Sequence, residues 1–98
     1  MITALIRHKV SSFEHWKPVF DAALDMRRKG GEESFRLFHD ATDPNTLTLV
    51  VDFASMEEAH RFLNSERLQA EMQKAGVVGA PDVYYLSELH FPRRTAAD

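Results

Sequence analysis

Histidines are the residues of this 98-residue chain best suited to acid–base chemistry. An imidazole has an ordinary pKa near neutral pH, so it can both accept and donate a proton there. The five histidines lie at positions 8, 15, 39, 60 and 90, and no pair is spaced i, i+4 around a helical glutamate. We therefore expect no metal site. No glycine-rich phosphate loop follows a strand either, and we expect no bound cofactor.

His8 and His39 are the candidates for a catalytic pair. They lie near the ends of the first and second expected strands, and the third strand begins beside both of those ends in a ferredoxin-like sheet. If the turn pairs His39 with Thr48, His8 can share that row and the two imidazoles can act as acid and base. The alternative is two half-exposed histidines that share no ligand, because a shift of one residue in register separates them.

Asp52 and Arg27 are polar residues at positions where the pattern predicts core. Asp52 lies in the apolar run LTLVVDF. If it is buried, its pKa would be raised and it could abstract a proton; otherwise it meets solvent or an arginine across a dimer. Arg27 projects from the apolar side of the first expected helix. It can reach back to the carbonyls at the helix end, or it can bind an anionic ligand.

Aromatic side chains are the expected walls of a pocket. Trp16, the only tryptophan, and Phe20 share the inward side of the helix that contains FEHWKPVF, whereas His15 lies outside it. Adjacent Tyr84 and Tyr85 point to opposite faces of a strand, so only one can line a pocket. The catalytic candidates are His8, His39 and Asp52, and the substrate-binding candidates are Trp16, Phe20, Arg27, Phe62 and Tyr85.

The elements that must position these residues alternate between strand and helix. The expected strands span residues 2–10, 34–41, 46–53 and 83–91. The expected helices follow Ser11 and Ser55, each of which has a glutamate three residues later, as in a capping box. Pro18 predicts a kink or a later helix start. This order predicts an α+β, ferredoxin-like βαββαβ fold with a four-stranded antiparallel sheet and helices on one face.

The expected domain covers residues 1–91, and residues 92–98 are expected to form a loose C-terminal tail. The strands carry apolar residues on both faces, although two helical regions can cover only one face. An uncovered apolar face usually meets a partner, so we expect a homodimer that packs sheet against sheet.

Composition excludes several other classes of protein. A net charge of −3 disfavours nucleic-acid binding, which needs a basic face. No apolar run reaches the ~20 residues that cross a bilayer, and the first residues lack the pattern of a signal peptide. Cysteine is absent, which removes disulfides and thiol nucleophiles. We expect a cytoplasmic protein without nucleic-acid or membrane partners.

Several stretches together resemble the dimeric α/β-barrel superfamily, which includes antibiotic-biosynthesis-monooxygenase-like and polyketide-cyclase-like small proteins. They are FEHWKPVFD, the Gly-Gly helix end, the DPN hairpin, SMEEAHRFLNSERLQAEMQKAGVVGAP and VYYL. The resemblance covers residues 1–91. It implies a cavity in each subunit between sheet and helices, where some members oxidise aromatic polyketides without metal or flavin. The haem-degrading branch uses a first-strand asparagine, a third-strand tryptophan and a late helical histidine. This chain has no such asparagine, ends its third strand in Phe53-Ala54 and has His60 early in its helix.

Two functions are consistent with these observations. The first is a cofactorless monooxygenase- or cyclase-like enzyme for an aromatic or apolar small molecule. The alternative is a non-catalytic homodimer that binds a small ligand or has a structural role. An open apolar cavity with two or more converging titratable groups would favour the enzyme, and a closed, fully packed interior would favour the alternative.

Overall fold

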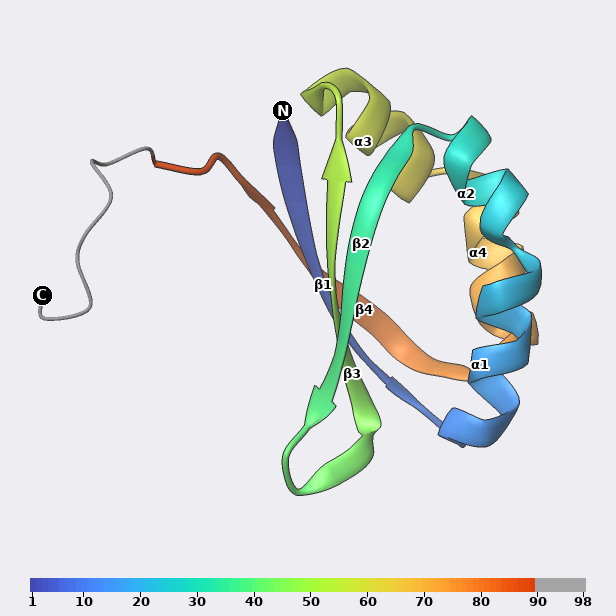
Figure 1. Cartoon of the computed structure of the whole chain (residues 1–98). Coiled ribbons are helices and arrows are strands. Elements are labelled where there is room, and N and C mark those ends of the chain that lie inside the picture. Colours follow the sequence, from blue (N-terminus) through green and yellow to red (C-terminus); the bar gives the residue numbers. More distant parts are fainter. Residues whose placement is uncertain (90–98) are drawn as a thin grey trace, which may run out of the picture.

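A computed structural model describes residues 1–89 as one four-stranded antiparallel sheet with all its helices on one face (Figure 1). The strand order is β2-β3-β1-β4, which confirms the predicted ferredoxin-like α+β fold. The elements are β1 (Ile2–Val10), α1 (Phe13–Ala22), α2 (Leu24–Lys29), β2 (Glu32–Asp40), β3 (Asp43–Phe53), α3 (Met56–Leu63), α4 (Glu66–Lys74) and β4 (Val77–Leu86). His90 and the expected tail lie outside the described residues.

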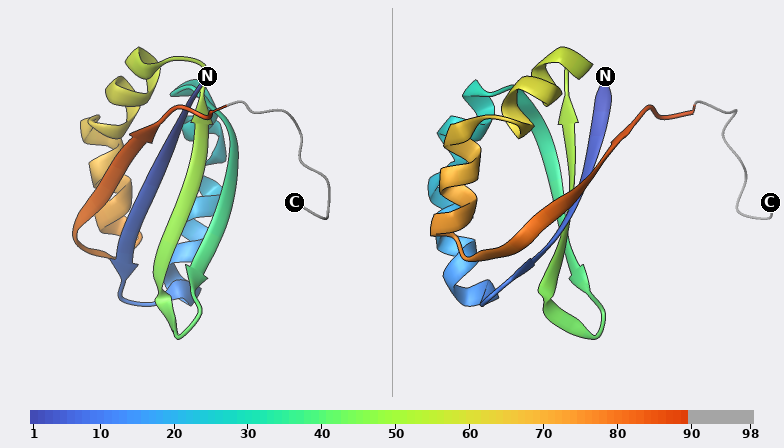
Figure 2. Two further views of the ribbon diagram at one scale, coloured as in Figure 1. Left: turned by 90° about the vertical axis from the view of Figure 1, so that its left-hand side faces the viewer. Right: turned by 180° about the vertical axis from the view of Figure 1, so that it is seen from behind.

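The core lies between the sheet and the helices, and it follows the two-residue period of the strands. In the middle of the sheet, β3 buries Leu47, Leu49, Val51 and Phe53 against the helices. Its neighbour β1 turns Ala4, Ile6, His8 and Val10 in the same direction. Figure 2 shows β1 between β3 and β4, so His8 occupies a core position on one of the two central strands.

The first helix begins one residue later than the capping-box pattern predicts. Ser12 is the N-cap, and its hydroxyl accepts a hydrogen bond from the His15 backbone N–H at 3.4 Å. Ser11 instead donates its own N–H to the Gly76 carbonyl at 2.9 Å, just before β4 begins. The N–H of Phe13, one of those left free at a helix start, donates to the Asn45 side chain at 2.9 Å. The β2–β3 hairpin thus holds the start of α1.

The first helical region, which comes before the Gly-Gly helix end at residues 30 and 31, is two helices. Pro18 lies inside α1, so the helix does not begin there, and the interruption comes at Ala23. The Ala23 N–H is shared between the carbonyls of Val19 and Phe20, both at 3.2 Å, in a tightened last turn. The short α2 that follows can therefore take its own direction along the sheet.

The second helical region and the last strand also refine the predicted boundaries. Ser55 caps α3 by accepting from the Glu58 N–H at 3.2 Å, as predicted, and Ser65 caps the separate helix α4. The last strand was expected to begin at residue 83, but β4 begins at Val77, because Val77 and Val78 pair with Val10 and Lys9 at the end of β1. Within residues 1–89, no helix is long and apolar enough to cross a membrane.

Candidate small-molecule site

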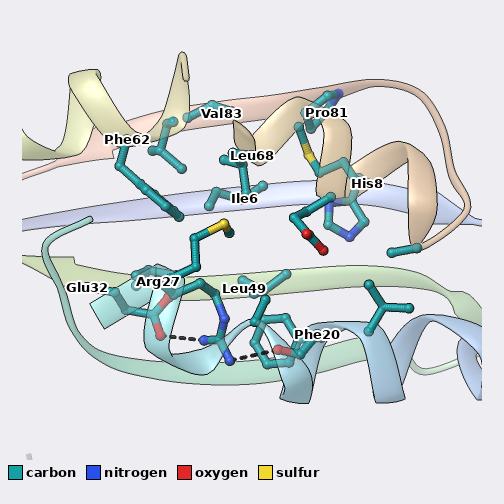
Figure 3. A pocket seen from close by; sticks show the side chains of 18 of the residues that line it. Ile6, His8, Phe20, Arg27, Glu32, Leu49, Phe62, Leu68, Pro81 and Val83 are labelled. Atoms are coloured by element: carbon teal, nitrogen blue, oxygen red, sulfur yellow. Dashed lines mark hydrogen bonds and ion pairs between the residues drawn. The ribbon is translucent and has the colours of Figure 1, made fainter. Parts of the chain in front are cut away.

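A cavity of about 90 Å³ lies between the sheet and the helices, and we call it the sheet–helix cavity (Figure 3). Its walls are mostly apolar side chains from β1, β3, β4 and all four helices. The titratable residues that line it are His8, Arg27, Glu32 and Glu71. An apolar pocket with a few polar groups is the usual form of a small-molecule site.

His8 reaches into this cavity from β1 (Figure 3). Its side chain is buried, and neither imidazole nitrogen has a hydrogen-bond partner within residues 1–89. Its ring centroid lies 5.9 Å from that of Trp16. Burial lowers the pKa of His8, because the charged form loses its hydration. At neutral pH the imidazole is therefore neutral and one of its nitrogens is free to accept a proton.

A bulge in β4 lies opposite His8. The pairing between β1 and β4 is interrupted at His8, where residues 79–81 bulge out of the ladder. Gly79 takes φ +73°, which glycine adopts without strain. Pro81 lacks an N–H that would need a partner, and its side chain lines the cavity. Bulges occur often beside functional sites, and Pro81 of this bulge and His8 line the same cavity.

Stacked aromatic rings form the wall that runs from His8 toward α2. The rings of Trp16 and Phe20 stack with centroids 4.6 Å apart and an interplanar angle of 17°. Phe20 meets Phe35 edge to face at 5.2 Å. Phe62 lines the cavity from α3 (Figure 3). The structure thus places the predicted aromatic residues Trp16, Phe20 and Phe62 at one cavity.

Arg27 and Glu32 form a buried ion pair at the other end of the aromatic wall. The Arg27 guanidinium also donates to the Phe20 carbonyl at 3.1 Å and lies 3.7 Å from the centroid of the Phe20 ring. Burial outweighs their attraction, so the pKa of Arg27 is lowered and that of Glu32 is raised. Arg27 Nε is buried without a partner in the described chain. The guanidinium therefore reaches a carbonyl at the end of α1, and it also lines the cavity.

Glu32 on β2 and Glu71 on α4 are the titratable cavity residues that sequence reasoning missed. Alternation from Phe35 back along the strand would place Glu32 on the face away from the helices. A register irregularity between Glu32 and Ser34 reverses this alternation, so Glu32 pairs with Phe53 and faces the core. No pattern in the sequence predicts this irregularity in the pairing of β2 with β3.

His39 lies outside the cavity. Both His8 and His39 pair with Leu47, so they share a row across the sheet, although the predicted partner was Thr48. Leu47 lies between them, and two strand spacings amount to roughly 9–10 Å. His39 is exposed, and its Nδ1 contacts the Asp40 carbonyl at 2.8 Å. The structure therefore does not bring the two imidazoles together.

Asp52 lies on the open face of the sheet, away from the helices. Thr3 and Ser34, its partners in the same row, each donate a hydroxyl hydrogen bond to its carboxylate at 2.7 Å. These bonds stabilise the charged form and lower the pKa of Asp52. Of the two alternatives for Asp52, the buried carboxylate with a raised pKa is wrong, because the side chain is not buried in apolar surroundings.

Tyr85 faces the helices, but it does not line the cavity. Its ring meets that of His60 edge to face at 4.5 Å, which places it against α3. His15 is exposed, and its Nε2 contacts the Lys74 carbonyl at 3.0 Å. No group of three or more possible metal-ligating side chains is found within residues 1–89.

The fold of the described residues is the fold of solved structures named as antibiotic biosynthesis monooxygenases. The chain matches no protein-family model and no curated protein sequence. A Bordetella bronchiseptica structure classed with the antibiotic biosynthesis monooxygenases has a TM-score of 0.75 and 17% identity, over 91% of this chain and 97% of that chain. SnoaB, a cofactor-independent oxygenase from Streptomyces nogalater, has a TM-score of 0.71 and 12% identity, over 94% and 97%. The resemblance of the sequence to this superfamily is thus matched by its fold. Identities this low define only the fold.

Proposed function

We propose that the protein is a cofactor-independent, monooxygenase-like enzyme that acts on a small aromatic molecule in the sheet–helix cavity. The observation that carries this proposal is the buried His8 imidazole, whose two nitrogens have no partner in the described chain and which lines an apolar cavity. A buried polar group without a partner costs stability, and such groups are expected where a ligand completes them.

In the proposed reaction His8 is the general base. It takes a proton from an acidic C–H or O–H of the aromatic substrate, and the resulting anion is electron-rich enough to reduce dioxygen. A methylene group and one O₂ then give a carbonyl group and one water. The stacked Trp16 and Phe20 rings hold the flat substrate and keep bulk water away from the anion. A lowered pKa keeps His8 in its neutral, basic form at neutral pH.

The size of the cavity limits the substrate. At about 90 Å³ it is smaller than the ~150 Å³ cavity that accepts benzene in another protein. Met26 and Met72 line it, and flexible methionine side chains can move to admit one ring. A wider pocket of about 390 Å³ shares Pro81 and Val83 with the cavity. A larger substrate would have to extend into this pocket between α4 and β4.

The test is dioxygen uptake with a panel of single-ring and fused-ring compounds that carry a methylene group beside a carbonyl, such as anthrones. We expect the protein to accelerate uptake and His8→Gln to reduce the rate by about 10²-fold or more, the typical contribution of a general base. His39→Gln, a substitution at the exposed histidine of the same row, is the matched control and should leave the rate unchanged. Equal rates for His8→Gln and the unsubstituted protein would refute the proposal.

A non-catalytic ligand-binding module is the second candidate. It is favoured by the positions of His39 and Asp52, which lie outside the cavity and leave His8 as the only predicted catalytic residue there. Saturable quenching of Trp16 fluorescence by aromatic compounds, with no dioxygen uptake for any of them, would support this second function.

The proposal includes a homodimer through the open face of the sheet. Among the described residues, Phe38, Val78, Tyr84 and Leu86 expose large apolar side chains, and their strand parity places them on this face. Tyr84 pairs with Leu5, which in turn pairs with Val50, so an apolar row spans three of the four strands and ends at Arg36 on β2. Sedimentation analysis should find a dimer, and Tyr84→Glu should dissociate it, whereas Gln69→Glu on α4 should not. A monomeric unsubstituted protein would contradict this part.

A further inference from the structure

Three basic side chains line a pocket that is distinct from the sheet–helix cavity. This pocket has a volume of about 300 Å³ and lies between the end of α2, the helix α3 and the start of α4. All three helices belong to the layer that covers one face of the sheet (Figure 1). Lys29 comes from α2, Arg61 from α3 and Arg67 from α4. We call it the three-helix pocket.

The basic side chains of this pocket are incompletely neutralised. Neither Lys29 nor Arg67 forms an ion pair within residues 1–89. Arg61 lies 3.6 Å from Glu57, but the two side chains are 69% and 87% exposed, so this pair contributes little. The chain has 15 acidic and only 12 basic residues, so the unpaired cations do not reflect a shortage of carboxylates.

Glu58 is the only carboxylate among the described residues that line the three-helix pocket. One of its oxygens lies 3.5 Å from the Ser55 hydroxyl, in the capping box at the start of α3. Negative charge is favourable there because of the helix dipole. Three basic and one acidic side chain give the pocket a formal charge of +2. The pocket therefore lacks about two negative charges.

The charge and the donor groups of the pocket indicate a phosphate group. A recess with one sign of charge concentrates ions of the opposite sign. Guanidinium groups donate paired hydrogen bonds to phosphate oxygens, and an ammonium group adds a compact charge. A phosphate monoester carries a charge of about −1.5 to −2 at pH 7, which matches the pocket. A carboxylate or a sulfate ester has a single negative charge and would leave part of the positive charge unbalanced.

Much of the remaining wall is suited to an organic group. It includes the half-buried Met26, the buried Phe62 and the backbone of Gly30. Met26 and Phe62 also line the sheet–helix cavity, so they separate the two sites. A volume of about 300 Å³ lies at the lower end of the range of small-molecule pockets. The three-helix pocket therefore has room for a small organic group beside the phosphate.

The charge of the whole chain indicates that the anion is small. The formal net charge is −3, so nucleic acid or an acidic membrane would be repelled by much of the remaining surface. A small ester lies within about one Debye length, ~8–10 Å, of the basic side chains alone and is attracted by them.

We propose that the three-helix pocket binds a small phosphate monoester, with its phosphate group among the three basic side chains and its organic group against Met26 and Phe62. This inference goes beyond the proposed function, because it concerns a second site with a different ligand chemistry. Neither the base nor the aromatic wall of the sheet–helix cavity is needed for it.

Calorimetric titration of the intact protein in phosphate-free buffer tests the inference with three probes. We expect phenyl phosphate to bind, and phenyl sulfate and inorganic phosphate each to bind at least about fivefold more weakly. Phenyl sulfate changes the charge at nearly constant shape, and inorganic phosphate lacks the organic group. Binding of phenyl phosphate should weaken as the salt concentration rises. Equal affinity for phenyl phosphate and phenyl sulfate, or retention on phosphatidic-acid vesicles without phenyl phosphate binding, would overturn the proposal.

Substitutions of exposed side chains separate the pocket from general charge attraction. Lys29→Gln and Arg67→Gln should each weaken phenyl phosphate binding about tenfold. Arg28→Gln is the matched control, since Arg28 is exposed beside Lys29 but does not line the pocket, and it should leave the affinity unchanged. Glu58→Gln keeps a capping-box residue, removes the negative charge and should tighten binding. Equal weakening by Arg28→Gln and Arg67→Gln would refute the proposed site.

The outcomes also separate this inference from the proposed function. Selective binding of phenyl phosphate without dioxygen uptake by any compound would sustain the inference and refute the enzyme. Dioxygen uptake that depends on His8, without any binding of phenyl phosphate, would sustain the enzyme and refute the inference.

Discussion

Replacement of His8 by leucine should stabilise the protein. The imidazole is buried with neither nitrogen paired in the described chain, and each buried unpaired polar atom costs about 1–3 kcal/mol. Leucine is of similar size, has no polar atom and would contact Trp16 and the apolar wall. We expect His8→Leu to raise the free energy of unfolding by about 1–3 kcal/mol. For a domain of this size each kcal/mol raises the melting temperature by roughly 4–8 °C.

Urea titration near pH 7 and thermal melts of both proteins measure this change. His39→Leu is the control, since His39 is exposed and its substitution should alter stability by no more than about 0.5 kcal/mol. A His8→Leu variant that is less stable than the unsubstituted protein by 1 kcal/mol or more would refute the reasoning, because it would show that the imidazole nitrogens have partners. A gain in stability together with a loss of activity is the pattern expected where stability is given up for function.

Three further predictions concern pH, charge and packing. Because the folded-state pKa of His8 is lowered, the unfolded chain binds more protons than the folded chain below about pH 6.5. The stability advantage of His8→Leu over the unsubstituted protein should therefore widen as the pH falls from 7. Urea titrations at several pH values measure this difference in stability, and a constant difference would contradict the prediction. Arg27→Met should cost about 3–5 kcal/mol because it leaves Glu32 buried and alone, and adding Glu32→Leu should restore most of the loss in a double-mutant cycle; additive losses would argue against a coupled pair. Gly30→Ala should cost about 1–3 kcal/mol in a chemical denaturation series, because its methyl group would lie 2.1 Å from the Phe62 ring, and an unchanged midpoint would show that the ring moves freely.

The sequence was sufficient for the fold and for most of the aromatic wall. Two capping boxes, alternating strands and a DPN turn reflect local rules, and they predict the element order that the structure confirms. Trp16 and Phe20 were placed correctly because a helical wheel depends only on spacing within one helix.

The positions of the polar site residues could not be predicted from local sequence patterns alone. His8 was a candidate by residue type, but its burial follows from sharing strand parity with Ala4 and Ile6 under the helices. Asp52 has the opposite parity to Val51 and Phe53, so it faces away from the cavity. Parity was readable from the sequence, although which face the helices cover was not.

Arg27 and Glu32 show where prediction from the sequence ends. Arg27 was recognised as an arginine on an apolar helix face, but its partner was not identified. The break at Ala23 and the irregularity before Ser34 bring the two side chains together. Both are small departures from regular geometry, and each is set by packing of the whole sheet against the helices rather than by a residue type.

The most direct test of the central claim is nitrogen-detected NMR of the histidine side chains during a pH titration, with and without an anthrone-like compound. We expect His8 to titrate below the usual value of about 6.5, and we expect the added compound to shift both of its ring nitrogens. The exposed His39 and His60 should show no response to the ligand. An imidazole at position 8 that titrates like an exposed one and ignores the ligand would contradict the account.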